Sequence, residues 1–327
     1  MPGRPRPGEF ELIRELFAPL AADEPGALGL LDDAALIAPR PGFELVTAID
    51  TIVEGVHFLP ADPPFDVARK LMRVNLSDLA AMGARPRAYL LGLVVPDALD
   101  FDWLRDFARG LASDQVRFGM TLAGGDTTAT TGPPCLSLTA IGEVEPGRAL
   151  LRSNAAPGEH IYVSGAIGDA ALGLRVLRGE DTGLPEDACE AAAVRYRLPE
   201  PRLSLGMAVP ASAAVDVSDG LVADLGHICV ASGLGARIEA ARVPLSGPAR
   251  AALELGTVGI ADVLTGGDDY ELVFTAPADR GNAVREAAAR VRVPVTRIGA
   301  MTEGEGVSVV DEAGAAMEIG RAGYAHF

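Results

Sequence analysis

Apolar residues in the first half of the chain alternate between helical spacing and short continuous runs. Phe10, Ile13 and Phe17 recur every three or four residues, which predicts an amphipathic helix. The first half as a whole predicts helices over residues 9–18, 65–82 and 101–117, and strands over residues 43–49, 88–95, 119–123 and 135–144. Gly83 predicts the end of the second helix. These elements together form one αβ unit.

A polar stretch with glycine and proline, residues 145–158, separates this unit from a second alternation of strands and helices. Such stretches are typical of domain boundaries. The second half predicts strands over residues 160–164, 213–217, 270–275, 295–300 and 306–310, and helices over residues 168–178, 221–232 and 279–291. Strands and helices therefore alternate in both halves. The predicted fold class is α/β (or α+β), with two domains over residues 1–150 and 151–327.

Composition is consistent with a globular protein. Of the 327 residues, 49% are hydrophobic and 22% are charged, and no apolar run approaches the roughly 18 residues of a membrane span. The basic start of the chain is followed by Glu9-Phe-Glu-Leu rather than by the apolar core of a signal peptide. We therefore expect a cytoplasmic protein that does not bind membranes.

The formal net charge is −17, with 45 acidic against 28 basic side chains. Nucleic acid is therefore not an expected partner, because its backbone requires a basic surface. Most of these acids are expected to serve as a solvated surface. The three cysteines stand far apart without CxxC spacing, which is not the pattern of a zinc site or of a disulfide framework.

Several familiar catalytic motifs are absent. Lys70 is the only lysine and is not part of a phosphate-binding Gly-Lys-Ser/Thr loop. The chain also lacks GxGxxG, HExxH and GxSxG, which disfavours a classical dinucleotide fold, zinc-dependent hydrolysis and elbow-type serine catalysis. Aspartate is the abundant candidate that remains. Its oxygens suit hard cations, above all Mg²⁺.

Several aspartates fall at the ends of apolar, strand-like runs or in the turns that follow those runs. They are Asp50, Asp126, Asp216, Asp219, Asp268 and Asp269. Strand ends present side chains to clefts, and two of these runs carry Gly-Gly before the acid, which would let backbone N–H groups approach a phosphate. For any single aspartate, a turn or a helix cap is the alternative interpretation, and Asp219 could simply cap the helix that follows it.

Asp78 differs because it lies inside a predicted amphipathic helix, where aspartate has poor propensity. A surface salt bridge and a ligand in a cleft are equally compatible with this position. An acidic pocket cannot hold a triphosphate without cations, because like charges a few ångströms apart repel strongly. Several carboxylates with several Mg²⁺ ions would neutralise both partners and stabilise the charge of a phosphoryl group in transfer.

Ten segments, in order and over nearly the whole chain, resemble one known family. They are Gly8-Glu-Phe-Glu-Leu-Ile, Leu31-Asp-Asp-Ala-Ala, Asp50-Thr-Ile-Val-Glu-Gly-Val-His-Phe58, Val74-Asn-Leu-Ser-Asp-Leu-Ala-Ala-Met-Gly-Ala84, Ala123-Gly-Gly-Asp-Thr-Thr128, Gly147-Arg-Ala-Leu-Leu-Arg-Ser153, Asp216-Val-Ser-Asp-Gly-Leu221, Asp224-Leu-Gly-His-Ile228, Gly266-Gly-Asp-Asp-Tyr-Glu-Leu272 and Gly323-Tyr-Ala-His-Phe327. The chain is similar to the thiamine-monophosphate kinases, which belong to the aminoimidazole ribonucleotide synthetase-like superfamily.

The resemblance implies ATP-dependent phosphorylation of thiamine monophosphate to thiamine diphosphate, by direct transfer of the γ-phosphoryl group on several Mg²⁺ ions. The implied metal ligands are Asp33, Asp50, Asp78, Asp126, Asp216 and Asp219, with backbone carbonyls at Ala48 and Ile49. The implied ATP contacts are Gly125, Asp126, Arg152 and Ser218, and the implied substrate contacts are His57, Asp268 and Tyr324. The implied fold has two αβ domains, with N-terminal sheets that pair across a homodimer and ATP in a cleft between domains.

The sequence departs from the family pattern at four places. Leu31 replaces a glycine, and Ala48-Ile49 replaces Ser-Thr, so that a hydroxyl ligand is lost and only a backbone carbonyl remains. Asp268 replaces a glutamate that is one methylene longer, and Ala129 replaces an arginine. These departures leave one magnesium position and the substrate contact at Asp268 open.

Two alternatives follow. One is another ATP-dependent synthetase of the same superfamily; a selenophosphate synthetase would need a reactive cysteine in an N-terminal glycine-rich segment, but the first cysteine is Cys135. The other is a degenerate relative that binds thiamine phosphate or nucleotide without turnover, which only the replacements at Leu31, Ala48 and Ile49 favour. For His57 and Tyr324 taken alone, a loop histidine and an anchor for the chain's end are the alternatives to substrate contacts.

Overall fold

The computed structural model describes residues 7–97, 99–320 and 323–324. Residues 325–327 of the Gly323–Phe327 segment therefore lie outside the described residues. The chain divides into two compact units: unit 1 comprises residues 1–79 and 84–147, and unit 2 comprises residues 80–83 and 148–327. Within the described ranges, no helix has both the length and the apolar character needed to cross a membrane.

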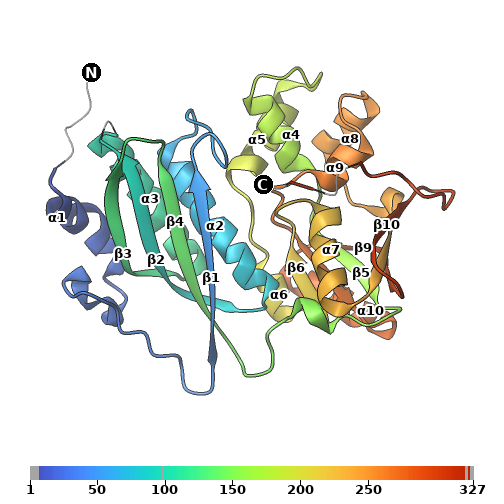
Figure 1. Ribbon diagram of the computed structural model, residues 1–327, viewed down its shortest axis with the longest axis horizontal. Helices are drawn as coiled ribbons and strands as arrows, with labels where there is room; N and C mark the ends of the chain where they lie inside the picture. The colour runs from blue at the N-terminus through green and yellow to red at the C-terminus, as the bar shows by residue number, and fades with distance from the viewer. Residues whose placement is uncertain (1–6, 98, 321–322, 325–327) are drawn as a thin grey trace. The chain divides into compact units, whose positions relative to one another are not determined.

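Unit 1 is built on a four-stranded sheet (Figure 1). In spatial order its strands are β1 (Glu44–Val53), β4 (Cys135–Val144), β2 (Arg85–Pro96) and β3 (Thr121–Thr130). Neighbouring strands are antiparallel except β2 and β3, which are parallel. A parallel pair needs a crossover, and α3 (Phe101–Phe118) supplies it.

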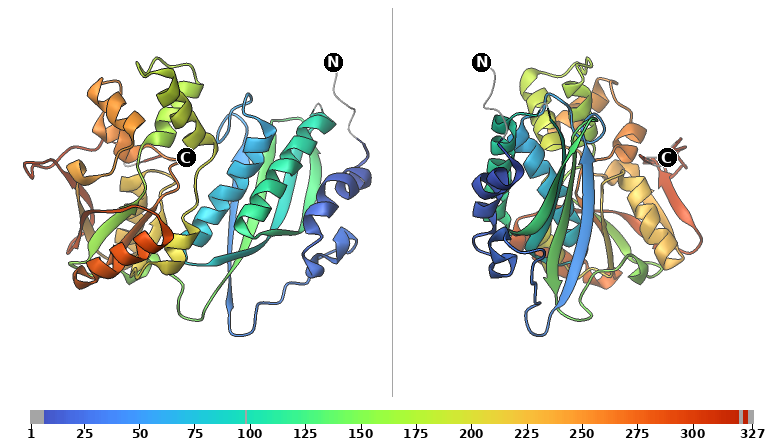
Figure 2. Two further views of the ribbon diagram at one scale, coloured as in Figure 1. Left: turned by 180° about the vertical axis from the view of Figure 1, so that it is seen from behind. Right: turned by 60° about the vertical axis from the view of Figure 1, so that its left-hand side comes forward.

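Two helices, α2 (Pro64–Ala81) and α3, lie side by side on one face of this sheet (Figure 2). Leu71 and Leu76 of α2 and Leu104 of α3 are fully buried there, as is Leu138 of β4. The N-terminal segment consists of α1 (Glu9–Leu12), η1 (Ile13–Phe17), η2 (Ala18–Ala21) and η3 (Pro25–Leu30). The predicted first helix is therefore present, but it changes to π and then 3₁₀ geometry after Leu12.

Unit 2 is built on a six-stranded sheet. In spatial order its strands are β10 (Gly306–Val310), β7 (Gly235–Glu239), β9 (Val295–Thr302), β5 (His160–Ser164), β8 (Leu272–Ala276) and β6 (Ala213–Asp216). One face packs on α7 (Leu221–Ser232), where Leu225 shares a buried cluster with Ile161 and Val273. The opposite face carries Tyr162 stacked on Phe274 and is covered by α10 (Gly281–Val291) (Figures 1 and 2).

The remaining elements of unit 2 are helical. They are α4 (Asp169–Leu177), α5 (Glu186–Arg197), α6 (Leu203–Ala208), α8 (Gly247–Glu254), α9 (Ile260–Thr265) and the short 3₁₀ turns η4 (Arg152–Asn154), η5 (Ala240–Arg242) and η6 (Ala278–Arg280). Helices α4, α5 and α8 share a small buried cluster of Leu172, Ala192 and Ala252. The predicted class, two domains that mix helices with sheets, is confirmed.

The prediction that the aspartates follow strands needs correction at three places. β1 continues to Val53 and β3 to Thr130, so Asp50 and Asp126 lie inside strands. Pairing with β2 extends β3 through its glycines: a Cβ at Gly125 would come within 2.1 Å of the Leu91 carbonyl oxygen. The apolar run before Asp268 is the helix α9, with the Asp262 carboxylate accepting from the Gly259 N–H at its start.

Candidate functional site

In unit 1, the carboxyl groups of Asp50 and Asp78 are in hydrogen-bond contact. The Asn75 side chain of α2 orients Asp50, because its Oδ1 accepts the Asp50 backbone N–H at 2.9 Å and its Nδ2 donates to the Leu71 carbonyl at 2.9 Å. Burial raises the pKa of Asp50 above its ordinary value, and the hydrogen bond with Asp78 opposes this to a smaller extent. Two such carboxyl groups in contact need a shared proton or a cation. Asp78 is half-buried and contacts another acid. Of the two interpretations that the sequence left open for Asp78, a ligand in a cleft is therefore favoured over a surface salt bridge.

Asp126 lies on the other face of the same sheet. Strand pairing places Asp50, Leu138, Leu91 and Gly125 in one row across the sheet. The neighbouring row of Thr51, Ser137, Gly92 and Asp126 points away from the helices. Three strand spacings separate β1 from β3, a distance of about 14 Å. Within one chain, Asp50 and Asp126 are therefore too far apart to share a metal ion.

The face that carries Asp126 borders a cavity of about 640 Å³, here called the sheet cavity. Four predicted site residues line it: Asp33, Ile49, Gly125 and Asp126. Asp32 joins them, and the rest of the lining is largely apolar, from the N-terminal segment and the exposed side of the strands. Ile49 and Asp33 thus meet Asp126 in one cavity, and Asp50 and Asp78 lie across the sheet from it.

The replacement of a family glycine by Leu31 fits the backbone without strain. Leu28, Gly29 and Leu30 have φ values of 52°, 68° and 56°, in the left-handed region. Leu31 itself has φ −110°, which any residue adopts, and its side chain is 91% exposed. The left-handed turn that presents Asp33 therefore ends before Leu31.

His57 lies in the turn after β1. Its Nδ1 accepts the Val53 backbone N–H at 3.0 Å, so in the neutral ring Nε2 carries the proton. The His57 carbonyl accepts a hydrogen bond from Lys70 Nζ at 2.8 Å, and Lys70 is only 2% exposed. The single lysine therefore supports the His57 turn.

In unit 2, Asp216 ends β6 and leads into a loop that Asp224 holds. Asp224 Oδ2 accepts the backbone N–H groups of Ser218, Asp219 and Gly220 at 2.9, 3.0 and 3.1 Å. Burial, followed by the negative charge of Asp216, raises the pKa of Asp224 to about 7. These three N–H groups are therefore engaged within the protein and fix the direction of the Ser218 and Asp219 side chains.

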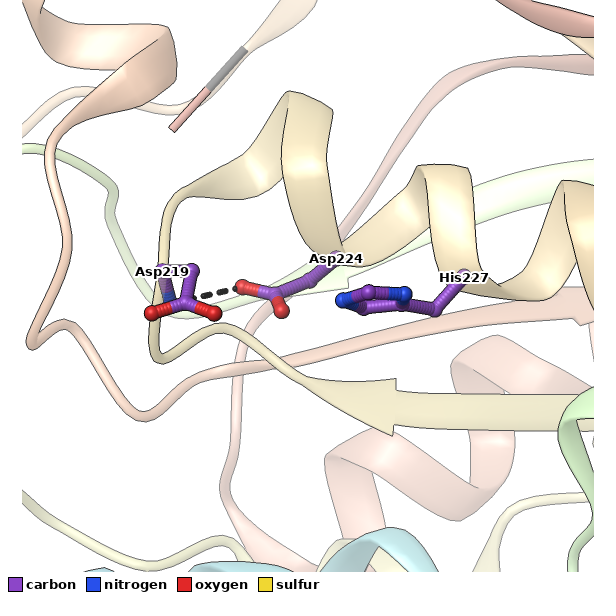
Figure 3. Close-up of side chains that lie close together, drawn as sticks. All are labelled: Asp219, Asp224 and His227. Atoms are coloured by element: carbon purple, nitrogen blue, oxygen red, sulfur yellow. Dashed lines mark hydrogen bonds between the residues drawn. The ribbon is translucent and has the colours of Figure 1, made fainter. Parts of the chain in front are cut away.

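Figure 3 shows that Asp219, Asp224 and His227 point toward one another. Each offers one ligand atom, and these atoms lie within 4.8 Å of one another. Sequence reasoning gave Asp224 and His227 no role. The available signal was their spacing, since residues three apart at the start of α7 share a helix face directly after Asp219.

Two further predicted residues join this loop. The Asp268 N–H donates to the Ser218 carbonyl at 2.8 Å, and the Tyr324 N–H donates to the Asp219 carbonyl at 2.9 Å. Asp268 has φ 69°, an uncommon conformation for an aspartate. Unit 2 thus brings together Asp216, Ser218, Asp219, Asp268 and Tyr324.

The Gly-Gly pair before Asp268 serves close packing and leaves few amides for a phosphate. A Cβ at Gly267 would come within 2.4 Å of the Ser218 carbonyl oxygen, and one at Gly266 within 2.7 Å of the Ala171 Cβ. The Gly266 N–H donates to the Asp262 carbonyl, and the Asp268 N–H is engaged as described. The phosphate-binding role predicted for these glycines is therefore not supported at this pair.

Two buried acids brace the strand that follows. Glu271 is fully buried and accepts from Ser164 Oγ at 2.6 Å, Arg202 Nε at 2.6 Å and Arg195 Nη2 at 3.0 Å. Asp269 is 1% exposed and accepts the N–H groups of Gly168 and Ala170. Burial raises the pKa of Asp269 to about 8, against the opposing effect of these two hydrogen bonds.

Arg152, a predicted ATP contact, has its backbone away from the loop that carries Ser218 and Asp219. Its carbonyl accepts from Ser232 Oγ at 2.8 Å, at the C-terminal end of α7. Asp219 precedes the N-terminal end of the same helix, and its 12 residues span about 18 Å. The exposed Arg152 side chain would have to bridge much of that distance.

Comparison with known proteins matches both units. Residues 31–144 match the family model "AIR synthase related protein, N-terminal domain", and residues 156–312 match "AIR synthase related protein, C-terminal domain". A curated relative, the thiamine-monophosphate kinase of Caulobacter vibrioides, is 46% identical over 94% of this chain and 88% of its own length.

Two solved structures are also similar over nearly their full lengths. The crystal structure of thiamine-monophosphate kinase from Stenotrophomonas maltophilia K279a is 41% identical, with a TM-score of 0.82, and the match covers 95% of this chain and 98% of that one. AaThiL, solved in complex with AMPPCP and TMP, is 31% identical, with a TM-score of 0.78 and coverage of 98% and 97%.

Proposed function

The chain belongs to the thiamine-monophosphate kinase family, and we propose that it transfers the γ-phosphoryl group of ATP directly to the phosphate of thiamine monophosphate on Mg²⁺ ions held by its aspartates. The observation that carries the metal part is the contact between the Asp50 and Asp78 carboxyl groups. A divalent cation between them would replace a costly like-charge contact by two favourable ones.

The donor atoms fit magnesium. The proposed ligands are the carboxylates of Asp33, Asp50, Asp78, Asp126, Asp216 and Asp219 and the backbone carbonyls of Ala48 and Ile49. All are hard oxygens, which Mg²⁺ prefers. Because Asp50 and Asp126 lie on opposite faces of the sheet, they would serve separate ions within one chain. When bound, the ions neutralise the phosphate groups and stabilise charge on the phosphoryl group in transfer.

The remaining residues would bind and orient the two substrates. We propose that Gly125, Asp126, Arg152 and Ser218 contact ATP, and that His57, Asp268 and Tyr324 contact thiamine monophosphate. His57 can donate from Nε2 to a phosphate oxygen, since its Nδ1 is already an acceptor. Tyr324 is 49% exposed and can stack on a cationic heterocycle. No covalent intermediate is required: one P–O bond to ADP breaks as another forms to the acceptor phosphate.

We also propose that the enzyme is a cytoplasmic homodimer that pairs through the sheet of unit 1. The face opposite α2 exposes Leu45 and Ile49, 40% and 65% respectively, on a strand that pairs with β4 alone among the described strands. A second copy would cover this apolar face and the open strand edge. Light scattering is expected to show a dimer for the wild type and a monomer for Leu45→Arg. A wild-type monomer at micromolar concentration would contradict this pairing.

The decisive assay combines purified protein, ATP, Mg²⁺ and thiamine monophosphate, followed by chromatography for thiamine diphosphate. Product is expected with Mg²⁺ and none with a chelator in excess. Absence of product under excess Mg²⁺ would refute the kinase proposal. Calorimetric binding of thiamine monophosphate without product would instead identify a degenerate binder, the outcome that the Ala48-Ile49 replacement would explain.

A further inference from the structure

Unit 2 has a polar cavity on the sheet face opposite α7, here called the α10 cavity. It measures about 210 Å³ and lies at the N-terminal end of α10. Its lining consists of His160, Tyr162, Ala278, Asp279, Gly281, Asn282, Arg285 and Arg297. Two strands, β5 and β9, and the segment η6–α10 therefore contribute to it. None of its lining residues has a role in the proposed kinase site.

Two guanidinium groups reach this cavity from different elements. Arg285 comes from α10, where its Nη2 donates to Asn282 Oδ1 in the first turn. Arg297 comes from β9, is exposed, and makes no ion pair with any residue that the structure describes. In a chain with a net charge of −17, this is a local excess of positive charge.

The hydroxyl group of Tyr162, at the end of an otherwise buried side chain, also borders the cavity. Tyr162 is only 3% exposed, yet its hydroxyl has no hydrogen-bond partner among the described residues. Gly281 leaves room beside it: a Cβ there would lie 3.2 Å from the Tyr162 hydroxyl and 3.7 Å from Arg285 Nη1. No side chain caps the start of α10. Guanidinium, hydroxyl and helix N-terminus thus converge on the space that Gly281 keeps open.

We propose that the α10 cavity binds a phosphate-type oxyanion, either inorganic phosphate or the terminal phosphate of a small ester. Arg285 and Arg297 supply planar pairs of charged donors, and the Tyr162 hydroxyl supplies a further one. The N-terminal end of an 11-residue helix adds favourable potential for an anion. The volume admits a phosphate with a small organic group but not a whole nucleotide triphosphate.

Two titratable groups face the bound anion as well. Asp279 of η6 opposes it by like charge. His160 of β5 reports on it, because burial and the charge of Arg297 lower the pKa of His160 below its ordinary value. An anion between Arg297 and His160 would counter that charge and raise the pKa of His160 again.

The test is a titration of the full-length protein with inorganic phosphate, read from the ring C–H resonance of His160 in nuclear magnetic resonance spectra. His160→Gln assigns that resonance among the chain's four histidines. A saturable shift at millimolar phosphate is expected for the wild type, and the pKa of His160 should rise on saturation. No saturable shift, or a shift without a rise in pKa, would overturn the proposal.

Matched variants of α10 and its surroundings test whether the positive charges at the α10 cavity bind the phosphate. Replacing Arg285 and Arg297 together by Gln should weaken phosphate binding by about tenfold or more, since two charged donors are lost. Arg290→Gln removes the same charge from the last turn of α10 and should leave binding unchanged. Asp279→Asn should strengthen binding. Equal binding by the double variant and the wild type would refute the assignment.

Comparison of ligands then distinguishes the possible sources of the phosphate. Tighter binding of thiamine monophosphate than of inorganic phosphate at His160 would identify an ester as the occupant, and equal binding would identify the free ion. An equal response to acetate would overturn the phosphate assignment, because the cavity would then respond to any small anion.

Discussion

Unit 1 and unit 2 hold their acidic residues in opposite ways. In unit 1, Asp50 lies on a strand and Asp78 on a helix, and the hydrogen-bond partner identified for the Asp50 carboxyl is another carboxyl. In unit 2, Asp224 and Asp269 accept backbone N–H groups from the loops around them. The first arrangement leaves charge to be compensated by a cation, whereas in the second backbone donors bind the carboxyl oxygens and burial raises the pKa, which favours the protonated acid.

This difference separates two roles that look alike in the sequence. Acids in regular elements of unit 1 place their carboxylates where the sheet and α2 hold them rigidly. The buried acids of unit 2 fix the loops that carry Asp216, Asp219 and Asp268. Substitutions in unit 1 should therefore reduce catalysis with little loss of stability, and substitutions of the buried acids in unit 2 should reduce stability first.

The largest effect is expected from Asp78→Asn. The variant replaces one of the two carboxyl groups in the Asp50–Asp78 contact, and that group is a proposed metal ligand. The value of kcat should therefore fall by about 1,000-fold while the protein stays folded. Steady-state kinetics with thermal unfolding in parallel would measure both. Asp106→Asn, which breaks an exposed ion pair with Arg109 on α3, is the control and should change kcat by less than about twofold. Near wild-type turnover of Asp78→Asn would remove Asp78 from the metal site.

Glu271→Ala should have the largest effect on stability. It leaves Arg202 and Arg195 without the fully buried carboxylate that pairs them, and breaking such a buried pair costs about 3–5 kcal/mol. Urea unfolding followed by circular dichroism would show a lower midpoint. Glu254→Ala, at an exposed position of α8, should leave the midpoint in place. An unchanged midpoint for Glu271→Ala would show that the network does not hold unit 2 together.

Asp269 should make stability depend on pH. Its pKa is raised from 3.8 to about 8, so the folded chain keeps a proton that the unfolded chain releases. Its contribution is therefore complete below pH 3.8 and is lost as the pH rises toward 8. Asp269→Asn should cost about 1–2 kcal/mol at acidic pH, because one of two acceptors is lost. This deficit should shrink as the pH rises above 3.8 and change sign before pH 8, because only the wild type loses stability over that range; unfolding free energies measured across the range would show this. A deficit independent of pH would contradict the raised pKa.

The smallest effect is expected at Leu31, where the family has glycine. Leu31→Gly should lower stability by only about 0.5 kcal/mol, because the exposed side chain packs on little and glycine makes the unfolded chain more flexible. Leu28→Gly should act in the opposite direction, since Leu28 has φ 52° and glycine relieves that strain. Thermal unfolding of the two variants would show the sign. Activity should be insensitive to Leu31→Gly; a marked gain would mean that Leu31 impairs the metal site.

Sequence patterns predicted most of the elements because the long helices and buried strands carry clear periods. The helix predicted over 65–82 and the helix Pro64–Ala81 agree within one residue at each end. The hydrophobic pattern failed where a strand is extended by backbone pairing with its neighbour rather than by apolar side chains. Gly124 and Gly125 lack side chains that would mark β3, and strand β3 forms there because β2 is alongside.

The candidate site was predictable only in part. Neighbouring motifs such as Asp216-Val-Ser-Asp219 indicated which acids matter, and unit 2 brings these together with Asp268 and Tyr324. Nothing in the sequence indicated that Asp224 would take three N–H groups of this loop, because that depends on how α7 begins. The separation of Asp50 from Asp126 likewise required strand register, which a single sequence leaves open.

The burial of Lys70 has a practical consequence for the helix that carries Asp78. A protease specific for lysine has one cleavage site in this chain, and that site lies inside α2 at Lys70, which is only 2% exposed. Cleavage therefore requires α2 to open. The rate of a single cut, seen as the conversion of one band into two on a gel, measures how often this helix leaves the sheet, and its slowing by ATP or Mg²⁺ would measure how firmly each ligand holds it in place.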